Sequence, residues 1–316
     1  MNTLVSTVVA IAAFSAVVAV AAFMRNTVYG AIEPLMSDSK KKYTIWWIVD
    51  DSQVNSRIWL DWNSRTSMTP NEPYLALCLR RAREMWSDNF DIKPLIGRVS
   101  VHRCLEEAGV SIPDGADRAP PSIWLPWCRA ALLNSLGGLW LDGSVLPLRR
   151  QSSELYARVA NVDVMTFGTD PDEGLCASEE SAPAAGRSAG WSRIPGHPMW
   201  SGMERDLRAI IAAGEPSWGA ATARRSLRWA WDKHCSGTLI DRNAEVSRDV
   251  YGRRLELDTL LGEHSWPTGE TSGGFWVPFP DGRDGLERAS AWKWFLRMSE
   301  KQILESKFMW AKWASE

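Results

Sequence analysis

Apolar runs and helical spacing predict an alternation of strands and helices along most of the chain. The run from Tyr43 to Val49 is aromatic and β-branched without alternation, which is typical of a fully buried strand. A helix over Tyr74 to Trp86 is predicted next, because its apolar residues recur at helical spacing. A strand near Asp91 to Leu95 and a helix over Val101 to Ala108, ended by Gly109, follow. This order of elements is typical of an α/β domain.

The stretch from Pro121 to Leu148 carries the strongest local signal. Its first half is predicted as a helix ended by Gly137-Gly138, because glycine takes the backbone conformations that close a helix. We expect Pro126 in the first turn of this helix, since deeper inside it would remove a backbone hydrogen bond. Leu139 to Leu141 then form a short buried strand that delivers Asp142 at its carboxyl end, where ligands bind in α/β sheets. An Asp in this position can also simply cap the next turn.

The second half of the chain continues the pattern with weaker signals. Strands are predicted over Val145 to Leu148 and Asp163 to Gly168, separated by a short helix over Glu154 to Val159. Gly190 to Ile211 holds a strand, a Pro-Gly-His-Pro turn and a helix. Apolar residues spaced among Lys and Glu from Trp292 to Trp313 predict an amphipathic terminal helix, which either packs on the domain or lies on a membrane surface.

The start of the chain has a different character. Leu4 to Met24 form an apolar run relieved only by two serines and a threonine, and its length is that of a helix spanning a bilayer. We therefore predict a membrane anchor over residues 1–25, a polar linker over 26–42 and a globular domain over 43–316. A secretory signal peptide is the alternative, although no basic residue precedes the run. The basic residues that follow the run favour a cytosol-facing globular part.

Composition and charge narrow the classes of function. Of the 316 residues 45% are hydrophobic, which is ample for a packed core. The net charge of -2 argues against nonspecific electrostatic binding of nucleic acid, so no nucleic-acid partner is expected. The five cysteines lack the spacing of zinc or redox sites, and the absence of a P-loop or dinucleotide fingerprint counts against a kinase or a dehydrogenase. The 19 tryptophans are unusual: core packing is the first expectation for each, and stacking on a sugar is the alternative.

The residues around Asp142 resemble the signature of the DXD-containing sugar transferases. The resemblance is closest to the capsular-polysaccharide-synthesis type and its eukaryotic mannosyl- and galactosyltransferase relatives. The shared order is Arg129, seven residues, Gly137-Gly138, Trp140 and Asp142, followed by an apolar strand. The resemblance extends over roughly Tyr43 to Ile211 and weakens beyond it. It implies a GT-A-like fold, with a mixed, mostly parallel sheet flanked by helices and one N-terminal transmembrane helix.

This resemblance implies a glycosyltransferase that moves a hexose from a nucleotide diphosphate sugar to a glycan or lipid-linked acceptor. A divalent cation, Mn²⁺ or Mg²⁺, would bridge Asp142 and the diphosphate, so Asp142 is the implied metal ligand. Arg129 would orient Asp142 or contact a phosphate. The remaining residues implied for the nucleotide or its metal lie at strand ends or in a late loop: Ser144, Gly138, Asp50, Asp51 and His264.

Two departures from the family pattern affect the chemistry of the site. The family has an Asp three residues before the arginine, where this chain has Pro126, and a second acidic residue in its motif, where this chain has Ser144. The metal site would therefore have one charged ligand fewer. The main alternative is a catalytically inactive transferase-like domain that serves as a structural or accessory subunit of a membrane complex. A third hypothesis is a glycan-binding module whose tryptophans bind sugar without metal.

The resemblance and the anchor together imply the partners and the location. The expected partners are a UDP- or GDP-hexose donor, a glycan or lipid-linked acceptor, the membrane and, for an accessory subunit, other proteins of a membrane complex. A eukaryotic member would be endomembrane or Golgi-type, and a bacterial one would lie on the cytoplasmic face of the inner membrane.

Overall fold

The computed structural model describes the chain at residues 42–49, 72–148, 152–167, 189–214, 229–230, 233–234, 240–241, 255–262, 274–279, 286 and 291–315. The chain divides into two compact units, Met1–Lys42 and Tyr43–Glu316, and the fold given below is that of the second. The predicted anchor, Asp50, Asp51 and His264 lie outside the described residues. Among the helices that are described, none is both long and apolar enough to cross a membrane.

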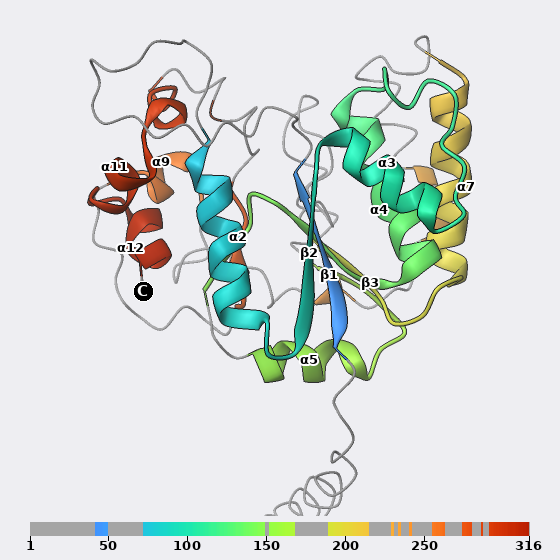
Figure 1. The fold of residues 1–316 in the computed structure, drawn as a ribbon, viewed down its shortest axis with the longest axis horizontal. Coiled ribbons are helices and arrows are strands. Elements are labelled where there is room, and N and C mark those ends of the chain that lie inside the picture. Colours follow the sequence, from blue (N-terminus) through green and yellow to red (C-terminus); the bar gives the residue numbers. More distant parts are fainter. Residues whose placement is uncertain are drawn as a thin grey trace, which may run out of the picture. The chain divides into compact units, whose positions relative to one another are not determined.

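A six-stranded mixed sheet forms the centre of the second unit (Figure 1). Five strands run in one direction, and β6 is antiparallel to both of its neighbours. In spatial order the strands are β2 (Phe90–Ile96), β1 (Tyr43–Val49), β3 (Gly138–Asp142), β6 (Ala189–Ser192), β5 (Val164–Phe167) and β7 (Ile240–Asp241). The expected α/β class with a mixed, mostly parallel sheet is confirmed.

Helices cover both faces of this sheet (Figure 1). One face carries α2 (Pro73–Trp86) together with the C-terminal segments, and their side chains form the first core. The other face carries α3 (Gly97–Glu107), α4 (Pro121–Leu136) and α7 (Pro198–Ala212), which form the second core. The remaining short elements are α5 (Ser152–Ala160), α9 (Leu257–Leu260), and the paired strands β4 (Leu146–Pro147) and β8 (Trp276–Val277).

Strand β1 is buried on both faces of the sheet, which explains why its sequence shows no alternation of apolar and polar residues. Ile45 and Trp47 enter the first core, whereas Trp46 and Ile48 enter the second. Because successive side chains of a strand point to opposite faces and both faces are covered by helices, every position in the middle of β1 must be apolar.

Tryptophans fill both cores, which agrees with the expectation that most of them serve core packing. Among the described residues, Trp229 is an exception, with 54% of its surface exposed. The buried tryptophans are Trp46, Trp47, Trp86, Trp124, Trp127, Trp140, Trp191, Trp200, Trp276 and Trp310.

Pro126 lies deeper in its helix than predicted. Helix α4 begins at Pro121, and the carbonyl oxygen of Pro120 accepts the first two backbone hydrogen bonds at 2.9 Å. Pro126 is therefore in the second turn, where it has no N–H to donate to the carbonyl of Ser122. Helix α4 tolerates this loss because it is buried on most sides, between the sheet, α3 and α7, so packing outweighs local propensity.

Helix α3 starts at Gly97 rather than at the predicted Val101. The glycine has φ 72°, a conformation that turns the chain directly from β2 into the helix. Arg98 then stacks over the ring of Trp124 at 4.8 Å and donates to the carbonyl oxygen of Ala116 at 2.8 Å. These contacts anchor the first turn of α3, which its sequence periodicity did not indicate.

The C-terminal segment is not the single amphipathic helix that was predicted. A 3-10 turn (Phe295–Arg297) is followed by two short helices, α11 (Glu300–Leu304) and α12 (Met309–Ser315). Ser299 interrupts the pattern because it starts α11 with a capping box: its Oγ accepts from the backbone N–H of Gln302, and its own N–H donates to the Gln302 side chain. The apolar side chains of this segment are buried in the first core, so it packs on the domain.

His102 on α3 is held by a tryptophan and a carboxylate. Trp124 Nε1 donates to His102 Nε2 at 3.0 Å, and His102 Nδ1 lies 3.4 Å from Asp117 Oδ1. Burial lowers the pKa of His102, with a smaller contribution from Arg98, against the opposing charges of Asp117 and Glu106. The neutral imidazole is therefore the form that fits the folded protein.

Replacing His102 with Gln is expected to flatten the pH dependence of stability just below neutrality. In the unfolded chain a histidine takes up its proton near pH 6.5, whereas folded His102 resists protonation to a lower pH. The unfolded state then binds more protons, so the free energy of unfolding falls as the pH drops below about 6.5. Urea denaturation of both proteins between pH 8 and pH 5 measures this slope. Equal slopes would show that His102 does not contribute.

Candidate functional site

Asp142 ends β3 at the carboxyl edge of the sheet. Its Cα is paired with that of Ile48, one residue before the end of β1. Directly after it, Gly143 donates its N–H to the carbonyl oxygen of Ile48 at 2.6 Å. A Cβ on Gly143 would lie 2.8 Å from that same oxygen and would also collide with Val49, so only glycine lets the chain turn this close to β1. The tight turn leaves Asp142 half-buried at the edge where ligands of α/β sheets bind.

Ser144 holds the Asp142 carboxylate in place. Its N–H and its hydroxyl both donate to Asp142 Oδ1, at 2.8 and 2.7 Å. The backbone carbonyl of Asp142 also accepts from Val145 N at 3.1 Å. This is the turn-capping arrangement of an Asp after a strand, and it explains why a small hydroxyl residue fits where the related motif has a second acid.

Helix α2 brings further polar groups to the same place. Cys78 Sγ donates to the backbone carbonyl of Ser144 at 3.8 Å, and one turn earlier the Tyr74 hydroxyl donates to Glu72 Oε1 at 3.5 Å. Burial raises the pKa of Tyr74 well above its usual value, with further contributions from the charges of Glu72 and Asp142. Burial, followed by the charge of Asp142, likewise raises the pKa of Cys78. Both groups therefore stay protonated at neutral pH.

Glu72 is the residue of this region that the sequence analysis missed. It precedes Pro73 at the start of α2, and only 1% of its surface is exposed. No motif marks it. Its signal is positional: it immediately precedes α2, the helix whose Cys78 contacts the turn after β3, and a linear sequence does not reveal this relation.

Arg129 approaches the edge from the opposite face of the sheet. It is buried in α4, with 7% of its surface exposed. Because α4 and β3 are joined at Gly137 and run in opposite directions (Figure 1), Arg129 lies about 10 Å along the helix from that junction, toward the end of the sheet that holds Asp142. Its predicted role beside Asp142 stays a prediction.

Gly138 is not brought to Asp142. It begins β3, about 13 Å from the strand's last residue by the rise of an extended chain. Its glycine has a structural reason instead: φ is 96°, and a Cβ would lie 2.6 Å from the carbonyl oxygen of Thr44. Gly138 therefore shapes the start of β3 and lies at the end of the sheet remote from the proposed ligand.

His197 has a structural role at the start of α7. It stands in the Pro-Gly-His-Pro turn, and its Nδ1 accepts from the backbone N–H of Met199 at 3.3 Å, which caps the start of α7.

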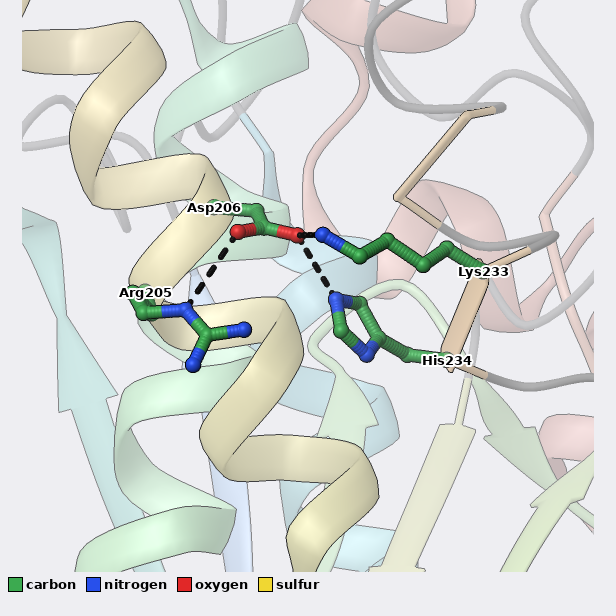
Figure 2. Close-up of polar contacts among 4 residues, drawn as sticks. All are labelled: Arg205, Asp206, Lys233 and His234. Carbon is green, nitrogen blue, oxygen red and sulfur yellow. Dashed lines mark hydrogen bonds and ion pairs between the residues drawn. The ribbon is translucent and has the colours of Figure 1, made fainter.

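Figure 2 shows a charged cluster in which Arg205 and Asp206 come from α7, and Lys233 and His234 come from a later segment of the chain. Asp206 Oδ2 lies 2.6 Å from His234 Nε2 and accepts from Lys233 Nζ at 2.9 Å, while Arg205 Nε is 3.5 Å from Oδ1. Burial acts to raise the pKa of Asp206, but the hydrogen bonds from His234 and Lys233 outweigh it and leave that pKa lowered. Gly202 makes room for the His234 ring. The cluster holds residues 233–234 against α7.

Within the described part of the chain, no group of three or more His, Cys, Asp or Glu side chains forms a ready cation site. A divalent cation at this edge would therefore need ligands besides the described side chains, from other parts of the chain or from a bound substrate. This fits Mg²⁺-type binding, in which one or two carboxylates act together with substrate phosphates and water. Asp142 offers a carboxylate oxygen at the required edge.

Comparison with known proteins assigns no family to this chain. No family model matches it, and no curated protein matches it. Among solved structures, one match is the crystal structure of a glycosyltransferase involved in the glycosylation of the major capsid of PBCV-1. The identity is 11% and the TM-score 0.40, over 80% of this chain and 98% of that chain. So distant a likeness carries no conclusion about this chain.

Proposed function

We propose that this chain is a membrane-anchored glycosyltransferase with a GT-A-like domain. It transfers a hexose from a UDP- or GDP-sugar to a hydroxyl of a glycan or lipid-linked acceptor. The observation that carries the proposal is the position of Asp142 at the carboxyl edge of a mixed, mostly parallel sheet, next to the end of β1. Together with the motif that resembles the DXD-containing transferases, this position supports a site for a nucleotide diphosphate.

For hexose transfer, the chain itself would supply the Asp142 carboxylate, whose position is already fixed in the folded protein. Ser144 holds Asp142 through two hydrogen bonds, and Gly143 locks the turn against Ile48. Because this carboxylate is already fixed in place, it could hold a cation beside the diphosphate without first having to reorient, and such preorganised charge is a main source of electrostatic catalysis. Arg129, buried behind the same edge, is proposed to orient Asp142 or to contact a phosphate.

Asp142 is the residue proposed to hold Mn²⁺ or Mg²⁺ together with the diphosphate oxygens. When bound, the cation supplies positive charge against the leaving diphosphate. Asp50, Asp51 and His264 stay candidates for the nucleotide from the resemblance alone. The predicted anchor implies a membrane location, on an endomembrane in a eukaryote and on the inner membrane in a bacterium.

A catalytically inactive domain is the second candidate, and one observation favours it. The hydroxyl that replaces the motif's second acid is used to cap the Asp142 turn. The same geometry would persist in an accessory subunit that had lost its donor site. This alternative predicts the same fold, but neither nucleotide nor metal would bind.

The experiment is a thermal-denaturation titration of the full chain against UDP, GDP and their hexoses, with and without Mn²⁺. A ligand at about 100 times its Kd adds about 2.7 kcal/mol to the free energy of unfolding. We expect one nucleotide to raise the Tm only when metal is present. Sugar binding that is indifferent to metal would favour a glycan-binding module, and no shift with any ligand would favour the inactive subunit.

A further inference from the structure

We infer that Cys78 positions the Asp142 carboxylate by holding Ser144 from the side of helix α2. The inference rests on the proposed function and deepens it, because it names a residue that acts on the cation site without contacting the cation. Cys78 is a positioning residue, since its thiol contacts Ser144, and Ser144 in turn binds Asp142.

The turn after β3 is fixed from two directions. On the sheet side, Gly143 donates its N–H to the carbonyl oxygen of Ile48 at 2.6 Å. On the helix side, Cys78 Sγ donates to the carbonyl oxygen of Ser144 at 3.8 Å. Ser144 is the residue whose N–H and hydroxyl both bind Asp142 Oδ1. The contact from α2 therefore fixes the residue that orients the carboxylate.

The Cys78 thiol satisfies a buried acceptor. Ser144 is 8% exposed, and Cys78 is fully buried. Within the described part of the chain, no backbone N–H donates to the carbonyl of Ser144, so the thiol is the donor that this carbonyl has there. A buried carbonyl that loses its partner carries a desolvation penalty, which favours a shift of the turn toward water or another donor. Removing the thiol is therefore expected to move Ser144, and Asp142 with it.

Helix α2 gives this contact a firm support. Cys78 lies in the interior of the helix, away from both of its ends. One turn earlier, the ring of Tyr74 packs against that of Phe295, with their centroids 5.6 Å apart. Two residues after Cys78, Arg80 forms an ion pair with Glu300 of α11. The C-terminal segment thus holds α2 in place, and Cys78 connects α2 to the turn after β3.

The expected effect on metal binding is moderate. Removing a group that hydrogen-bonds a metal ligand typically weakens metal binding about 10- to 100-fold. Cys78 stands one contact further from the metal, behind Ser144, and a thiol is a weak donor. The loss should therefore be smaller than that caused by removing a direct partner of Asp142.

The test is Mn²⁺ binding to the full chain with UDP and, separately, with GDP, measured by the loss of the electron paramagnetic resonance signal of free Mn²⁺. We expect Cys78→Ala to weaken Mn²⁺ binding about three- to tenfold. Cys78→Ser keeps a donor at this position and should restore most of the affinity. Leu77→Val, which removes a buried methylene from the neighbouring position of α2, is the matched control. It should lower the ligand-free Tm but bind Mn²⁺ as the wild type does.

The outcomes separate this inference from the proposed function. If Asp142→Asn weakens Mn²⁺ binding and Cys78→Ala does not, the inference is overturned and the proposed function stands. An equal loss in Leu77→Val would show that lower stability is the cause, and an equal loss in Cys78→Ser would show that the donated hydrogen bond is not; either result overturns the inference. If the wild-type chain binds no Mn²⁺ with UDP or GDP, the inference and the proposed function are both overturned. Should Cys78→Ala fail to fold, Cys78→Val, which fills the space but donates nothing, takes its place.

Discussion

Asp142→Ala is expected to abolish the stabilisation of this protein by a nucleotide and metal. Asp142 is the carboxylate that the turn at Gly143 projects at the carboxyl edge, so its removal takes away the charge that a bridging cation requires. At about 100 times the Kd the wild type gains about 2.7 kcal/mol, and the variant should gain nothing. The measurement is the difference in Tm with and without UDP or GDP, in the presence of Mn²⁺.

The same substitution also removes the acceptor that caps the turn, so it lowers stability even without ligand. The Tm shift caused by ligand is therefore measured for each variant against its own ligand-free form. Ser144 would lose the acceptor of two hydrogen bonds, which costs about 1–2 kcal/mol even without ligand. Asp142→Asn separates the two roles, because its amide oxygen still accepts from Ser144 while its charge is gone. We expect Asp142→Asn to keep most of the ligand-free stability and to lose the metal-dependent shift. A full shift in Asp142→Asn would contradict the metal-binding role.

Gly138→Ala is expected to destabilise the fold by about 3 kcal/mol or more. The residue has φ 96°, where an L side chain is strained, and its Cβ would lie 2.6 Å from the carbonyl oxygen of Thr44 in β1. That contact is with backbone, so it can be relieved only by moving β3 away from β1. The Trp46 Nε1 bond to the carbonyl of Gly137, 2.7 Å long, would be disturbed as well. Chemical denaturation measures the loss.

Gly196→Ala is the matched control for this prediction. Gly196 has φ 77°, but a Cβ there would meet nothing within 4 Å. Its replacement should therefore cost only the conformational strain, about 1–2 kcal/mol. If the two variants lose the same stability, the clash with Thr44 is not the cause. A Gly138→Ala variant with wild-type stability would show that β3 begins differently.

The central elements of the fold could be predicted from sequence because their signals are local. The uninterrupted apolar run of β1, the helical spacing of α2 and the glycines after α4 each need only neighbouring residues to be interpreted. The predictions were wrong where residues far apart in the sequence determine the local structure. Pro126 is accommodated by the burial of α4, and α3 starts early because Arg98 finds Trp124 and Ala116.

The candidate site likewise contains residues that the sequence indicates and residues that only the structure reveals. Asp142 and Ser144 could be chosen from sequence, since a strand that ends in Asp followed by small residues has a recognisable pattern. Cys78, whose thiol contacts the carbonyl of Ser144, could not be chosen, because nothing near it in the chain relates it to this turn. Gly138, which the family motif implied for the ligand, lies at the opposite end of β3 from Asp142, and the close approach of Thr44 explains why this position is a glycine.

The sequence by itself determined the α/β class, the order of the main elements and the carboxylate at the end of β3. These follow from hydrophobic periodicity and from the conformational preferences of glycine and proline, which act over a few residues. Only the tertiary structure decided which groups share the edge of the sheet. Pairing β3 with β1 and packing α2 on one face of the sheet brings Cys78 to the turn that follows Asp142. That proximity comes from packing between segments far apart in the chain, and local propensity holds no information about it.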